Sequence, residues 1–135
     1  MKRIAIASIG LLAFVPALAE NISDADRIIC SPADVKLCFE NGECFDTSPW
    51  EIDMPEFIII DLKKKTIRTT EASGQDRSTT FTAMERQDGV LFMQGIESGR
   101  AFSFVVEELT GILTASVARD GVSVSVFGAC TDADF

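Results

Sequence analysis

The residues of this sequence with the clearest chemistry are four cysteines, whose thiols can be oxidised in pairs to disulfides. Cys30, Cys38 and Cys44 lie within a stretch of fifteen residues, and Cys130 lies near the end of the chain. An even number of cysteines in an exported chain is typical of a disulfide framework. Each of the three possible pairings joins Cys130 to one early cysteine. We therefore expect one bridge to tie the start of the domain to its end.

The pairing depends on the turn at 40–43, where Asn-Gly predicts a tight hairpin. A two-residue loop would place Cys38 and Cys44 on different faces of the hairpin. A three-residue loop with a bulge would set them directly opposite each other. We favour Cys38–Cys44 together with Cys30–Cys130, and the other two pairings stay open.

Side chains suited to catalysis are scarce. The sequence has no histidine, the commonest general base and metal ligand. Neither zinc spacing nor an ordered calcium loop is present, so we predict no metal and no cofactor. Glu51, Asp53 and Glu56 cluster in the sequence and would suit a small carboxylate-based hydrolase, which is the alternative to a protein without catalytic residues. Our main expectation is that the protein is not an enzyme.

Five residues are predicted to contact a ligand or partner: Trp50, Ser98, Gly99, Arg100 and Phe102. Trp50 is the only tryptophan and has a proline before it and another shortly after it. It would serve as an aromatic platform for a ligand or, alternatively, as an anchor that closes one end of a barrel. The other four residues form a turn between two predicted strands.

The elements that position these residues are predicted to be strands. Short runs of β-branched and aromatic residues recur about every ten residues, separated by turn residues such as Asp88-Gly89 and Asp120-Gly121. The runs cover 57–62, 66–70, 79–86, 90–96, 101–108, 111–119 and 122–129. Several of them alternate apolar and polar residues, as a sheet with one buried face requires. We predict an all-β fold, a small antiparallel up-and-down β-barrel or sandwich of about seven or eight strands.

The ends of the domain are predicted to differ from this pattern. Ser31-Pro32-Ala33-Asp34 offers a capping serine, a proline at the first helical position and an early acid, which favours one short N-terminal helical turn. Residues 20–27 and 131–135 are predicted to be loosely held.

The first 19 residues have the features of a signal peptide. Lys2 and Arg3 precede an apolar run, and Ala17-Leu18-Ala19 provides small residues for cleavage. The apolar run is shorter than the roughly 20 residues that a membrane span needs. We therefore predict one disulfide-linked β-domain over 20–135, located in the periplasm or secreted.

The charge of this domain limits its partners. The leader holds two of the 12 basic residues and none of the 21 acidic ones, which leaves a net charge of −11. Nucleic acid and anionic lipid would be repelled by such a charge, whereas a cationic protein would be attracted.

Much of the chain after the leader resembles a family of small, uncharacterised secreted proteins from proteobacteria. The most specific matching feature is the closing Phe127-Gly128-Ala129-Cys130. The early cysteines also match, as do the segments 57–62, 88–91, 94–95, 99–103 and 110–117. This resemblance implies no catalytic or binding residues. The turn at 98–102 is also similar to the loop that periplasmic lysozyme inhibitors insert into an enzyme, although it lacks their tyrosine.

Taken together, these patterns predict an exported, non-enzymatic binding or structural module whose partner is a cationic protein. A lipocalin-like carrier of an apolar ligand is a further alternative. The carrier predicts an internal cavity, whereas a core filled by packed phenylalanines would oppose it.

Overall fold

Strands with alternating buried and exposed side chains form one antiparallel sheet in the computed structural model, which describes residues 21–133. Its strands are β1 (Arg27–Phe39), β2 (Cys44–Thr47), β3 (Ile58–Asp61), β4 (Thr66–Thr69), β5 (Ser78–Thr80), β6 (Ala83–Gln87), β7 (Val90–Glu97), β8 (Arg100–Glu107), β9 (Ile112–Arg119) and β10 (Val122–Asp132). Two short 3-10 helices, η1 (Pro49–Ile52) and η2 (Glu71–Ser73), interrupt the strands, and no α-helix occurs in the described region. The all-β prediction is confirmed, but the sheet has ten strands rather than seven or eight.

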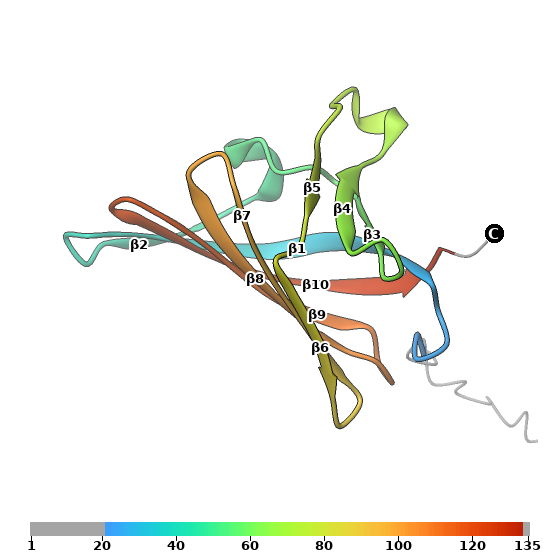
Figure 1. Cartoon of the computed structure of the whole chain (residues 1–135). Coiled ribbons are helices and arrows are strands. Elements are labelled where there is room, and N and C mark those ends of the chain that lie inside the picture. Colours follow the sequence, from blue (N-terminus) through green and yellow to red (C-terminus); the bar gives the residue numbers. More distant parts are fainter. Residues whose placement is uncertain (1–20, 134–135) are drawn as a thin grey trace, which may run out of the picture.

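The sheet is curled into a half-barrel rather than a closed barrel or a sandwich (Figure 1). The strand order is β5-β4-β3-β1-β10-β9-β8-β7-β6. β2 also pairs with β1, at residues beyond those that pair with β3. Strands β6 to β10 follow the predicted up-and-down order through tight hairpins. The first and last strands, β1 and β10, are neighbours in the middle of the sheet.

The predicted strand at 79–86 divides into two strands at opposite ends of this order. Only Phe81 and Thr82 separate β5 from β6. The Phe81 N–H donates to the carbonyl of Lys65 at one end of the sheet, and the Thr82 N–H donates to the carbonyl of Gln94 at the other, over 2.8 Å each. The chain therefore bends from one sheet edge to the other, and the bend keeps the two edges close at this end.

The predicted helical turn at 31–34 is wrong, because these residues belong to β1. The register with β10 shifts between Pro32 and Asp34, which marks an irregularity opposite Gly128. On the other side of β1, pairing with β3 ends at Cys30 and pairing with β2 starts at Val35. Pro32 thus lies where no strand is paired on that side, so its missing N–H removes no hydrogen bond there.

The prediction that the ends are loosely held is also wrong for the described residues. Ile22 and Ala25 are buried in the hydrophobic core, and the Ile22 N–H donates to the Glu108 carbonyl over 2.8 Å. Ala133 is buried too, and its N–H donates to the Arg27 carbonyl over 2.9 Å. The segment before β1 therefore closes the end of the half-barrel that holds Glu108.

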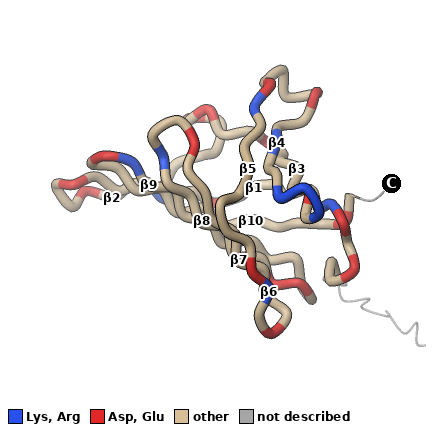
Figure 2. Tube along the Cα trace, viewed as in Figure 1, with Lys and Arg blue, Asp and Glu red and all other residues tan. Residues whose placement is uncertain are grey.

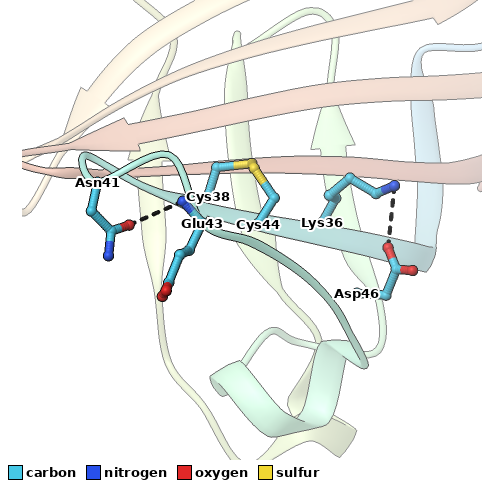
Figure 3. The surroundings of a disulfide bond; sticks show 6 residues. All are labelled: Lys36, Cys38, Asn41, Glu43, Cys44 and Asp46. Atoms are coloured by element: carbon cyan, nitrogen blue, oxygen red, sulfur yellow. Dashed lines mark hydrogen bonds and ion pairs between the residues drawn. A yellow bond between two sulfur atoms is a disulfide. The ribbon is translucent and has the colours of Figure 1, made fainter.

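Both disulfides join neighbouring strands, and the favoured connectivity is confirmed. Cys30–Cys130 links β1 to β10, where the two residues are register partners. Cys38–Cys44 links β1 to β2 across the hairpin (Figure 3). The Phe39 N–H donates to the Glu43 carbonyl over 2.9 Å, which leaves the predicted three-residue loop between them. No described cysteine is free.

The disulfides indicate an oxidising compartment outside the cytoplasm. Residues 21–133 contain no helix long and apolar enough to cross a membrane. The predicted signal peptide, residues 1–19, lies outside the described residues.

Candidate ligand pocket

The inner face of the half-barrel is built of rows of side chains, because register partners on adjacent strands point to the same side. The mouth row crosses β7, β8, β9, β10 and β1 and consists of Glu97, Arg100, Arg119, Val122 and Phe39. The middle row, two residues further in on each strand, consists of Gly95, Phe102, Val117, Val124 and Leu37. The deep row consists of Met93, Phe104, Ala115, Val126 and Val35.

The opposite wall comes from β3, β4 and the segment that follows η1. Ile58 and Ile67 face inward from the two strands, while Ile52 and Met54 pack against the core from the loop. In Figure 1 these elements stand across from the hairpin of β7 and β8. The two walls enclose a cavity of about 530 Å³. This volume lies within the range of small-molecule binding sites.

Below its mouth, the wall formed by β7 to β10 is apolar, while Thr69, Ser78 and Thr79 add polar groups on the opposite wall. Phe104 is four positions beyond Arg100 along β8, which corresponds to a depth of about 14 Å at about 3.4 Å per residue. The pocket wall over this distance includes the middle-row valines Val117 and Val124 and the deep-row Ala115. An apolar molecule would lose its contact with water against this wall.

Three phenylalanines pack together beside the cavity. Phe81, at the bend between β5 and β6, contacts the rings of Phe102 and Phe104 with centroid distances of 5.7 and 6.2 Å. Phe102 and Phe104 lie 5.4 Å apart. The phenylalanines are therefore packed, as a filled core would require, but only Phe102 and Phe104 line the cavity, and they do not fill it.

The mouth carries an excess of positive charge, although the whole chain has a net charge of −9. Its charged lining residues are Arg77, Arg100 and Arg119 and the two acids Asp53 and Glu97. Arg68 also borders the cavity, but it alternates with the inward-facing Ile67 and therefore points to the outer face of β4. Arg77 lies on the segment before β5, and its guanidinium lies 3.1 Å from the Glu97 carboxylate on β7. This ion pair connects the two walls.

Arg100 and Arg119 are adjacent on neighbouring strands, because Ala101 and Ala118, the next residues along, are register partners. Both belong to the inner face, because residues an even number of positions apart on a strand point to the same side. Arg100 is two positions from the buried Phe102, and Arg119 is four positions from the buried Ala115. Within the described part of the chain, neither arginine forms an ion pair. Two like charges therefore meet at the mouth.

The predicted binding residues fall into two groups. Arg100 and Phe102 line the pocket. Ser98 and Gly99 form the exposed tight turn between β7 and β8, with φ of 49° and 75°. Trp50 on η1 is 76% exposed and is not part of the pocket lining, so the interpretation as a buried anchor is wrong. Its role as an aromatic platform stays a prediction.

The buried position of Phe102 bears on the similarity to lysozyme inhibitors. Only 8% of the residue is exposed, and its ring packs on the inner face against Gly95. Insertion of this ring into another protein would require it to leave the core. The exposed residues of this turn are Ser98, Gly99 and Ala101, and Arg100 is partly exposed.

The acidic cluster proposed for hydrolysis has another local role. The Glu51 carboxylate accepts hydrogen bonds from the Thr47 hydroxyl at 2.7 Å and from the Ser48 N–H at 3.1 Å. The bond from Thr47, followed by that from Ser48, lowers the pKa of Glu51. This direction suits a carboxylate that caps η1 and not a general acid, which needs a raised pKa.

Figure 2 shows the acidic residues spread over turns at several ends of the sheet. Among residues 21–133, no group of three acidic or cysteine side chains is placed to hold a metal ion. Sequence reasoning missed Arg77, Arg119 and Glu97 as pocket residues. For Arg119, the alternation of Leu113, Ala115 and Val117 was the available signal.

No protein-family model, curated protein or solved structure matches this chain. The two family resemblances drawn from its motifs therefore stay predictions.

Proposed function

We propose that this protein is a non-enzymatic binding protein that carries an apolar small molecule in the pocket. The observation that supports this proposal is a cavity of about 530 Å³ with apolar middle and deep rows. Soluble proteins usually fill such space, since an unfilled apolar cavity forfeits packing contacts. The two disulfides agree with action outside the cytoplasm, which we place in the periplasm or the secreted medium.

Binding of a neutral apolar fluorophore, N-phenyl-1-naphthylamine, tests the proposal. We expect an increase in its fluorescence that saturates at a 1:1 ratio with the folded protein. Ala115→Phe should place a ring in the deep row and weaken binding at least about tenfold, the equivalent of losing about two buried methylene groups at about 0.8 kcal/mol each.

Ser116→Phe is the matched control. Ser116 is the next residue on β9 and points to the exposed outer face, so the same ring is added without filling the cavity. Circular dichroism and thermal unfolding should show that both variants fold. If the fluorophore fails to bind the wild-type protein, or binds both variants equally well, the proposal is wrong.

A cationic protein partner is a second candidate, favoured by the net charge of −9. Attraction between exposed charges should weaken with salt, because the screening length falls from about 10 Å at 0.1 M to about 3 Å at 1 M. Added lysozyme, captured at low salt and released at high salt, would support this candidate. Capture that is indifferent to salt would contradict it.

A further inference from the structure

We infer that the ligand of the pocket is an anionic amphiphile, with its charged head at Arg100 and Arg119 and its apolar tail against the middle and deep rows. This inference rests on the proposed function, because it specifies the chemical class that the same pocket accepts. Its basis is the change in chemistry along the pocket, from positive at the mouth to apolar within about 14 Å.

The two arginines favour an anion for electrostatic reasons. Like charges on directly adjacent strand positions destabilise a sheet. Both side chains are guanidinium cations, so Arg100 and Arg119 repel each other unless an opposite charge lies between them. An anionic group between them would neutralise the repulsion and accept charge-assisted hydrogen bonds from both guanidinium groups.

The neighbouring charges do not satisfy this need. Glu97 is the register partner of Arg100, but its carboxylate lies 3.1 Å from Arg77 on the opposite wall. Asp53 also lines the mouth, so three lining arginines, Arg77, Arg100 and Arg119, stand against two lining acids. Glu40 and Asp120 lie in the adjoining turns and do not line the pocket. Among the lining residues, the positive charges thus exceed the negative ones by one.

The rows beneath the arginines exclude other anions. Val117 and Val124 lie directly beneath Arg119 and Val122, and Leu37 continues the same row. A polar anion that extended along these rows would bury polar groups against apolar side chains, which is costly. A neutral apolar ligand would fit the rows but would leave the two arginines opposed.

Displacement of N-phenyl-1-naphthylamine by four dodecyl compounds tests the inference. The compounds are dodecanoate, dodecyl phosphate, dodecanol and dodecylamine, each used as a monomer. We expect the two anions to bind at least about tenfold more tightly than dodecanol, and dodecylamine to bind most weakly. The comparison of carboxylate with phosphate shows which anionic head is preferred. Free acetate and free phosphate should not displace the fluorophore.

Arg100→Gln combined with Arg119→Gln should remove the preference for anions. Dodecanoate should lose at least about tenfold in affinity, while dodecanol and the fluorophore keep theirs. Lys64→Gln with Lys65→Gln is the matched control, since it removes the same charge from an exposed turn outside the pocket. This control should keep the preference.

The possible failures are distinguishable. If dodecanol binds wild type as tightly as dodecanoate, or the arginine variant keeps its preference, the inference is wrong and the proposed apolar pocket stands. If the fluorophore and all four dodecyl compounds fail to bind, the proposed function is wrong and the inference fails with it.

Discussion

Loss of the two disulfides should have very different effects on stability, because they close loops of different length. Cys30 and Cys130 are 100 residues apart, whereas Cys38 and Cys44 are six apart. In the chain-entropy model a 100-residue loop contributes about 4.7 kcal/mol, and the same relation gives about 2.2 kcal/mol for six residues. The difference of about 2.5 kcal/mol is large for a protein with a total stability of about 5–15 kcal/mol.

Burial increases this difference. Cys30 and Cys130 are both buried in the sheet, so the double change Cys30→Ala, Cys130→Ala also leaves unfilled space. Cys44 is exposed, so Cys38→Ala with Cys44→Ala has little of this effect. At about 4 °C per kcal/mol for a domain of this size, the expected falls in melting temperature are about 20 °C and about 9 °C.

Urea unfolding followed by far-ultraviolet circular dichroism would give the free energy of unfolding of each double variant. Fluorescence of Trp50 is a poorer signal, since its ring is already mostly exposed in the folded state. A variant without the long bridge that does not fold at all would agree in direction with the expectation. Equal losses, or a larger loss without the short bridge, would refute the reasoning from loop length and burial.

Three further changes test other parts of the fold. Gly128→Ala should destabilise by about 3 kcal/mol, the upper end for overpacking, because its Cβ would collide with the Ser31 carbonyl oxygen in β1; urea unfolding measures this loss, and an unchanged midpoint would contradict it. Arg86→Met should cost about 3 kcal/mol, because the Glu108 carboxylate is only 2% exposed and would lose the guanidinium 2.6 Å away. Glu108→Gln should lower the free energy of unfolding by less than Arg86→Met does. If calorimetry finds the larger loss for Glu108→Gln, the role given to this ion pair is wrong. Glu51→Gln should remove a local transition on acidification: the pKa of Glu51 is lowered in the folded state, so its contribution is present at neutral pH and is lost as pH falls through that lowered pKa. Nearby tryptophan fluorescence monitors this transition, and an identical titration in the variant would exclude Glu51 as its origin.

Local patterns predicted the fold best where the contacts are local. The hairpins of β6 to β10 follow from alternation and from turns such as Asp88-Gly89, whose φ values of 50° and 75° fit a tight turn. The three-residue loop at 40–42 was also predictable, because only this loop length sets Cys38 directly across from Cys44. These features depend on residues close together in the sequence.

Features that depend on distant strands were not predictable in the same way. Ser31-Pro32 has the composition of a helix start, but pairing with β10 outweighs this local preference. The bend at Phe81 reflects pairing with Lys65 and Gln94 at opposite ends of the sheet. The pocket mouth likewise brings together arginines from separate strands, and their proximity appears only when the sheet curls.

The arrangement of the disulfides also has a consequence for biosynthesis. The chain emerges with its N-terminus first, so Cys30, Cys38 and Cys44 meet an oxidant well before Cys130 does. Pairing in order of emergence would join Cys30 to Cys38 and block the native strand contacts of both. Early closure of the short hairpin bridge removes both incorrect partners of Cys30. If the hairpin bridge closes first, Cys130 is the one partner left for Cys30, whose thiol then stays reduced until the last strand arrives.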